Sequence, residues 1–78
     1  MKRVKVYKLI EDLEEINIFC IDNILSIKTW DNRIDVFTTH NSHKIERKDF
    51  RKAVIDLPKL DIELDDFDKF VMYIIDNI

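Results

Sequence analysis

Glycine is absent from this sequence of 78 residues, and proline and cysteine occur once each. Glycine-rich loops bind phosphate through backbone amides that approach the ligand closely, so the common nucleotide-binding motifs are excluded. The single cysteine, Cys20, excludes an internal disulfide and is typical of a reducing compartment, where a lone thiol packs as a small hydrophobic residue. No motif predicts a cofactor.

Long apolar segments are absent as well. No run approaches the roughly 18 apolar residues that cross a bilayer, and alternating charge follows Met1-Lys2-Arg3 where a signal peptide would be apolar. These features predict a cytoplasmic protein without a membrane partner, and residues 1–78 are expected to form one domain. Abundant Ile, Lys, Asp and Asn indicate AT-rich coding, which is typical of a low-GC bacterium or one of its phages.

The N-terminal segment has helical spacing. Apolar residues stand at i, i+3, i+4 and i+7, which predicts an N-terminal helix with one buried face. A competing interpretation is a strand over residues 4–7, where valines alternate with Lys5. The apolar positions are Val6, Leu9, Ile10, Leu13 and Ile16.

Residues 18–39 predict a β-meander, because Ile, Val, Phe, Thr and Trp dominate and Asp-Asn occurs twice. Asp and Asn tolerate the left-handed conformation of tight hairpin turns, so Asp22-Asn23 and Asp31-Asn32 are predicted to join three strands. The expected strands cover residues 18–21, 24–30 and 33–39. A fourth short strand is expected over residues 43–47.

The two turns fix a register that charge can test. Lys28 then lies opposite Asp35, Trp30 opposite Arg33, and Ser26 opposite Phe37, with Phe19 beside Ser26. One face becomes wholly apolar, and it consists of Ile18, Cys20, Leu25, Ile27, Ile34 and Val36. The other face carries a candidate partner-binding set of Phe19, Lys28, Trp30, Arg33 and Phe37, because exposed aromatics beside arginine are typical of interfaces. In the alternative interpretation a helix covers this face and its aromatics are core.

Two helices are predicted after the meander. Asp49 can cap a helix that ends before Pro58, and its inward residues would be Phe50, Ala53, Val54 and Leu57. Leu60, Ile62 and Leu64 then alternate with acidic residues, in a strand or an extended linker. The last helix begins after Asp65 and carries an apolar stripe of Phe67, Phe70, Val71, Ile74, Ile75 and Ile78. The expected fold is therefore an α+β domain with an N-terminal helix, an antiparallel meander of three to four strands, and two C-terminal helices.

Catalytic chemistry is not predicted. Cys20 has no histidine placed to activate it, and the acidic residues follow helix capping and solvated faces. His40 and His43 flank a turn and could hold a metal only with an added carboxylate, so two loop histidines are the favoured interpretation. No catalytic or metal site is expected.

The middle of the chain is basic although the net charge is −3. Phosphate contact is the alternative function of this stretch, and the order helix, three strands, helix is similar to the layout of double-stranded-RNA-binding domains. Glu46 and Asp49 interrupt the stretch, and the glycines of that family's loops are missing. The basic residues are Lys44, Arg47, Lys48, Arg51 and Lys52.

The sequence thus predicts a small regulator or inhibitor that is not an enzyme and that occupies a partner protein's surface. A phage or mobile element is a candidate source of such a phage protein. Segregated charge would orient such an association. The alternatives are a nucleic-acid-binding domain, an acidic mimic of DNA formed by the Asp-rich tail, and a homodimer formed through an exposed sheet edge.

Overall fold

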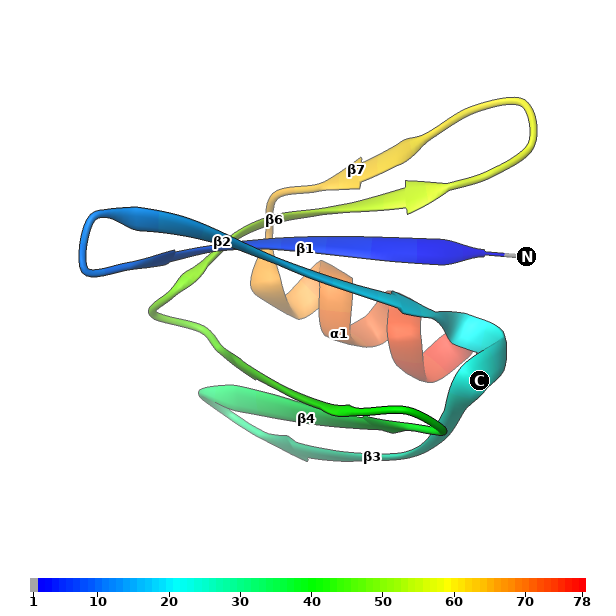
Figure 1. The fold of residues 1–78 in the computed structure, drawn as a ribbon, viewed down its shortest axis with the longest axis horizontal. Helices are drawn as coiled ribbons and strands as arrows, with labels where there is room; N and C mark the ends of the chain where they lie inside the picture. Colours follow the sequence, from blue (N-terminus) through cyan, green and yellow to red (C-terminus); the bar gives the residue numbers. More distant parts are fainter. Residues whose placement is uncertain (1) are drawn as a thin grey trace.

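The computed structural model describes residues 2–78, and it is mostly β, with two antiparallel sheets and one C-terminal helix (Figure 1). Sheet A has four strands in the order β2-β1-β6-β7, and sheet B has three in the order β3-β4-β5. The predicted α+β arrangement with three helices is therefore wrong. The elements are β1 (Arg3–Ile10), β2 (Leu13–Cys20), η1 (Ile21–Asn23), β3 (Ile24–Trp30), β4 (Arg33–Thr38), β5 (Ser42–Glu46), β6 (Phe50–Asp56), β7 (Ile62–Leu64) and α1 (Phe67–Asp76).

A β-hairpin replaces the predicted N-terminal helix. Strands β1 and β2 pair along their whole length, from Arg3 opposite Cys20 to Ile10 opposite Leu13. Glu11 and Asp12 form the turn with φ of 50° and 65°, the left-handed conformation that two-residue hairpins require. The helical spacing was misleading because the turn at residues 11–12 interrupts it. The buried positions of β1 alternate as in a strand, but one of them is a lysine, Lys8.

Strand β6 replaces the helix predicted after Asp49. It pairs with β1, so that Val6 lies opposite Ala53 and Val4 opposite Ile55. All four of these side chains are fully buried, which fits the period of two of a strand. The apolar residues from 50 to 57 fit both the helical period of about 3.6 residues and the strand period of two. Pairing with the distant β1 selected the strand. The segment after it forms β7, the strand alternative for residues 62–64.

The β3–β4 hairpin confirms the predicted register. Trp30 lies opposite Arg33, Lys28 opposite Asp35, and Ser26 opposite Phe37. The other Asp-Asn pair does not make a hairpin, because residues 21–23 form the 3-10 turn η1 that leads from sheet A into sheet B. The predicted strand over residues 18–21 is instead the end of β2, paired with β1. The short fourth strand is confirmed as β5.

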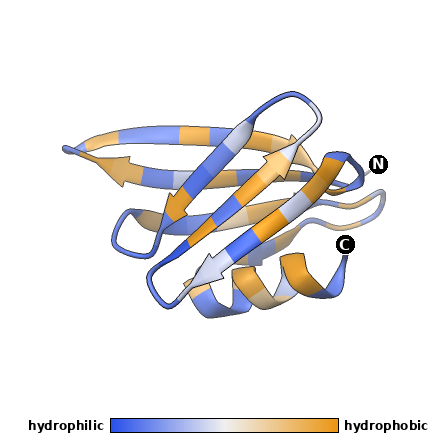
Figure 2. Ribbon diagram, turned by 90° about the horizontal axis from the view of Figure 1, so that it is seen from below, coloured by the Kyte–Doolittle hydropathy of each residue, from blue (hydrophilic) through white to orange (hydrophobic). Residues whose placement is uncertain are grey.

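The core lies between the two sheets and is closed on one side by α1 (Figure 1). Orange and blue alternate along the strands in Figure 2, because each strand presents one face to the core and one to solvent. Asp66 caps α1 by accepting a hydrogen bond from the Lys69 amide, one residue later than predicted. Phe70 is fully buried and stacks on Phe50, with ring centroids 5.3 Å apart. The helix packs against β6 and β7, not over the outer face of sheet B.

Candidate protein-binding face

The outer surface of sheet B gathers most of the side chains that the sequence proposed for partner binding. Ile34 and Val36 of β4 point into the core and are fully buried, so the alternate residues of that strand point outward. Directly opposite residues share a face, which adds residues of β3 and β5. We call this surface the sheet B face, and it comprises Lys28, Trp30, Arg33, Asp35, Phe37 and Lys44.

Cations lie over aromatic rings on this face. The Arg33 guanidinium carbon is 4.1 Å from the centre of the Trp30 ring, and Lys28 Nζ is 5.9 Å from the centre of the Phe37 ring. Trp30 remains 47% exposed. Such contacts are worth about 0.5–1 kcal/mol at exposed sites, so they orient the side chains more than they stabilise the fold.

Charges of alternating sign cross the sheet in one row. Asp35 on β4 lies between Lys28 on β3 and Lys44 on β5. Arg33 Nε lies 3.3 Å from Asp35 Oδ1, which is an ion-pair distance, but both atoms are buried and neither makes a hydrogen bond of good geometry. The contact is therefore an ion pair without a hydrogen bond.

Phe19 does not belong to this face, contrary to the sequence prediction. It lies on β2 in sheet A, is 5% exposed, and packs inward with its ring centroid 5.0 Å from that of His43. The error follows from the strand pairing, because β2 pairs with β1 and not with β3. Phe19 is core because β2 belongs to sheet A, and not because a helix covers the sheet B face as the alternative interpretation proposed. Phe37 stays on the outer surface.

A polar cluster that the sequence did not predict lies between the sheets on the side of β2 and β5. His43 is 8% exposed, and its Nδ1 donates to Asn17 Oδ1 at 3.1 Å. Lys8 is 7% exposed, and its Nζ donates to the Lys44 carbonyl oxygen at 3.3 Å and lies 3.8 Å from Glu15 Oε1. Burial, and secondarily the charge of Lys8, lowers the pKa of His43 from its ordinary value. His43 is thus a core histidine, whereas His40 in the preceding turn is exposed.

The five basic residues of the alternative nucleic-acid site do not share one surface. Lys44 lies on the sheet B face, Arg47 and Lys48 lie in the turn before β6, and Arg51 and Lys52 lie on β6 in sheet A. Three of them have acidic partners, namely Asp68 for Arg47, Glu14 for Arg51 and Glu63 for Lys52. This stretch of sequence therefore does not form a continuous basic patch.

Arg47 connects three elements of the fold. Its Nε and Nη2 donate to the Asp31 carbonyl oxygen at 3.0 and 2.6 Å, and its Nη1 and Nη2 donate to the Asp68 carboxylate at 3.1 and 2.7 Å. These hydrogen bonds lower the pKa of Asp68 and raise that of Arg47. Arg47 therefore ties the β3–β4 turn to the first turn of α1, so its role is structural.

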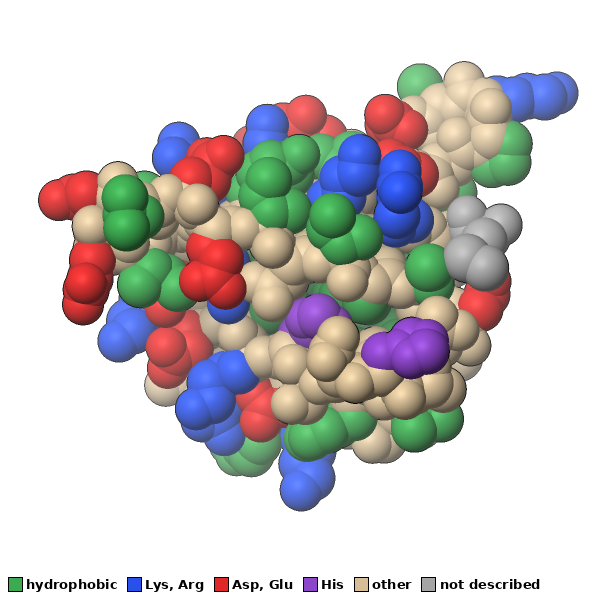
Figure 3. Space-filling view, in the orientation of Figure 1, with side chains coloured by type: hydrophobic (Ala, Val, Ile, Leu, Met, Phe, Trp, Pro, Cys, Tyr) green, Lys and Arg blue, Asp and Glu red, His purple; other side chains and the backbone are tan. Residues whose placement is uncertain are grey.

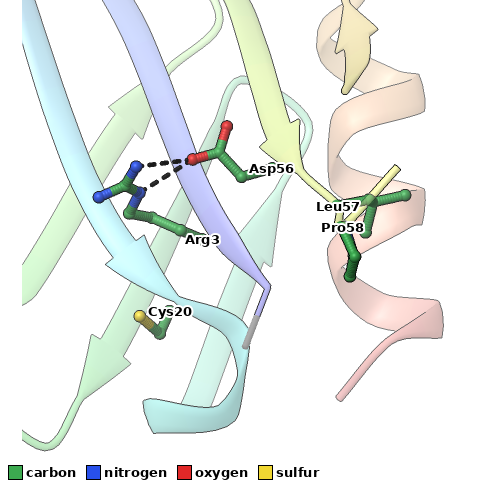
Figure 4. Close-up of a pocket in the computed structure, with 5 residues that line it drawn as sticks. All are labelled: Arg3, Cys20, Asp56, Leu57 and Pro58. Carbon is green, nitrogen blue, oxygen red and sulfur yellow. Dashed lines mark hydrogen bonds and ion pairs between the residues drawn. The ribbon is translucent and has the colours of Figure 1, made fainter. Parts of the chain in front are cut away.

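One hollow has a volume of about 380 Å³ and is lined by Arg3, Cys20, Asp56, Leu57 and Pro58 (Figure 4). Arg3 Nε and Nη2 both lie 2.9 Å from Asp56 Oδ2, so the two charges satisfy each other. No histidine lines this hollow, whereas a second hollow is lined by Cys20 together with His40 and His43. Among residues 2–78, no three His, Cys, Asp or Glu side chains group closely enough to hold a metal ion.

Comparison with protein-family models, curated proteins and solved structures finds no match to this chain. Within the described residues, the ten-residue α1 is the one α-helix, and it is too short to cross a membrane.

Proposed function

We propose that this protein is a small non-enzymatic binding module that regulates or inhibits a partner protein by covering part of its surface with the sheet B face. The observation that carries the proposal is the stacking of Arg33 on the exposed ring of Trp30, outside the core and uncovered by α1. Trp and Arg are the residue types enriched at interface positions that dominate binding energy.

The side chains of this face are already ordered before binding. Asp35 and the Trp30 ring both hold the Arg33 guanidinium, and Lys28 lies over Phe37. Ordering a long side chain at an interface costs about 0.5–1.5 kcal/mol, so a preformed arrangement reduces that cost on binding. The face also rests on the rigid β3–β4 hairpin, whose alternate residues Ile34 and Val36 are fixed in the core.

Charge on the face would orient a partner. The row Lys28, Asp35, Lys44 alternates in sign, and Arg33 and Glu46 lie opposite each other in the next row. A complementary partner therefore needs a carboxylate near Lys28 or Lys44 and a donor near Asp35. Such a pattern penalises partners of the wrong register more than it adds raw affinity.

Partner capture by variants tests the proposal. The tagged protein and its Trp30→Ala and Arg33→Ala variants are used to recover proteins from cells that express the gene, and recovery is quantified by mass spectrometry. One protein should be enriched by the wild type and lost by both variants, with a reduction of about 30-fold or more for a dominant contact of 2 kcal/mol or above.

The matched control is Leu60→Ala, because Leu60 is 70% exposed and lies outside both sheets. Circular dichroism should show that all three variants fold. Equal recovery of the same partner by the wild type and the Trp30 and Arg33 variants contradicts the proposal.

A further inference from the structure

The free edge of β2 differs from the other three sheet edges of the molecule. Among the described residues, β2 and β7 are the outer strands of sheet A, and β3 and β5 are those of sheet B. Proteins protect such edges from pairing with other chains by making them short or by placing charge, especially lysine, in their middle. Strand β7 has three residues with Glu63 at its centre, while β3 carries Lys28 and β5 carries Lys44.

Strand β2 has no such protection over most of its length. It is eight residues long, and its acidic residues, Glu14 and Glu15, stand near one end. Its middle is Ile16-Asn17-Ile18, in which the two isoleucines are 48% and 52% exposed on the outer face of sheet A. An unprotected apolar edge of this length is a template for pairing with another strand.

Hydrophobic side chains also gather beside this edge. Tyr7 lies opposite Ile16 on β1, and Val54 of β6 lies opposite Lys5, which in turn faces Ile18. Figure 3 shows hydrophobic side chains grouped above the two histidines on the side of the molecule that faces the viewer. The isoleucines of the edge therefore adjoin hydrophobic side chains of β1 and β6, with Lys5 and Lys52 between them.

We infer that β2 pairs antiparallel with β2 of a second copy of this chain, about a two-fold axis at Asn17, and joins the two sheets A into one. In this register Ile16 lies opposite Ile18 of the second copy, and the reverse pair is equivalent, so four isoleucines meet on the outer face. An isologous contact of this kind closes after two chains.

The pairing of the isoleucines and the position of Glu14 together select this register over its neighbours. Residues on the same face of the sheet must pair, so the axis can lie at residue 16, 17 or 18. An axis at Ile16 places the Glu14 carboxylate opposite Ile18, and an axis at Ile18 places it opposite Asp22. An axis at Asn17 places it opposite Cys20, whose neighbour on β1 is the cation Arg3.

The dimer would leave the sheet B face open. Sheet B lies on the opposite side of the core from the outer face of sheet A (Figure 1). The two-fold axis would lie at the free edge of β2, perpendicular to the joined sheet. Both copies of the sheet B face would then point to the same side. A partner with repeated sites would be bound by two faces at once, which raises the apparent affinity without a new contact.

Analytical ultracentrifugation of the full chain tests the association. The wild type should approach twice its 9.5 kDa mass as concentration rises. Ile18→Lys places a lysine in the middle of the edge and should raise the dissociation constant by more than about tenfold, an effect of 1.4 kcal/mol or more. Met72→Lys is the matched control, because Met72 is 62% exposed on α1, and it should dimerise like the wild type. A wild type that stays monomeric at every concentration, or a dimer that Ile18→Lys leaves intact, overturns the inference.

Disulfide trapping tests the register separately and does not depend on how Ile18→Lys folds. Glu14→Cys should form a covalent dimer on mild oxidation, since position 14 lies opposite Cys20 of the second copy. Positions 14 and 20 are six residues apart, which is about 20 Å within one strand, so neither an internal disulfide nor a link between like positions can form. Leu13→Cys and the double variant Glu14→Cys with Cys20→Ser should not crosslink. The proposed register is overturned if these controls crosslink as fast as Glu14→Cys. It is also overturned if no variant crosslinks.

Discussion

The outer surfaces of the two sheets differ in what they offer a partner. Sheet A ends in the aliphatic edge of β2, where main-chain groups and the half-exposed Ile16 and Ile18 face solvent. Sheet B carries its exposed groups across the middle of the sheet, where Arg33 stacks on Trp30. Main-chain pairing at an edge depends little on side-chain identity, whereas a patterned face discriminates between partners. The comparison indicates that sheet A is suited to self-association and sheet B to recognition of another protein.

Both surfaces depend on one core, and the variant with the largest expected effect should remove them together. Phe70→Ala deletes a fully buried ring that stacks on Phe50, so it should lower the free energy of unfolding by about 3–5 kcal/mol. That loss is a large part of the 5–15 kcal/mol typical of whole domains.

Urea denaturation followed by circular dichroism measures this loss. Met72→Ala, on the exposed side of the same helix, should change stability by less than about 0.5 kcal/mol. A Phe70 variant as stable as the Met72 variant would show that α1 does not close a shared core.

The side of the core near β2 should be the more sensitive to pH. Burial and Lys8 lower the pKa of His43 below its ordinary value of 6.5, so the unfolded chain binds a proton more readily than the folded one. The stability due to neutral His43 is complete above pH 6.5 and is lost as the pH falls through the lowered pKa. The Asp68 pKa is lowered from 3.8, so its contribution is lost only in more acidic solution.

Urea midpoints between pH 7.5 and pH 5 check this expectation. The midpoint should fall with pH in the wild type and in His40→Gln, whose side chain is exposed, and should fall less in His43→Gln. Equal slopes in all three proteins would contradict the burial of neutral His43.

The smallest predicted effect concerns the sheet B face. A double-mutant cycle with Trp30→Ala and Arg33→Ala should give a coupling free energy of about 0.5–1 kcal/mol, because the stacked pair is exposed to solvent. Unfolding free energies of the four proteins provide the coupling. Strict additivity would show that Arg33 and Trp30 are not held together before a partner binds.

Local sequence rules predicted the parts of the fold that are local. The Asp31-Asn32 turn and the charge pair of Lys28 and Asp35 gave the correct β3–β4 register, which placed Trp30 and Phe37 on the outer face. Local rules failed where distant segments decide the structure, since β6 is a strand because it pairs with β1. The same failure misplaced Phe19, whose partner strand is β1 and whose ring contact is His43.

The N-terminal hairpin was hidden for a different reason. Its turn uses Glu11 with positive φ, a residue without a particular preference for that conformation, where Asn or Gly would have marked it. Its buried row includes Lys8, which interrupts the apolar alternation of β1. A strand with a buried lysine and an atypical turn is difficult to distinguish from an amphipathic helix by periodicity alone.

The most direct test of the assignment of recognition to sheet B measures partner capture and molecular mass together for Trp30→Ala and Ile18→Lys. Trp30→Ala should lose the captured protein and keep the mass of the wild type in solution, whereas Ile18→Lys should become monomeric and still capture the partner. Loss of the partner by Ile18→Lys with full capture by Trp30→Ala would place recognition on sheet A and contradict the account.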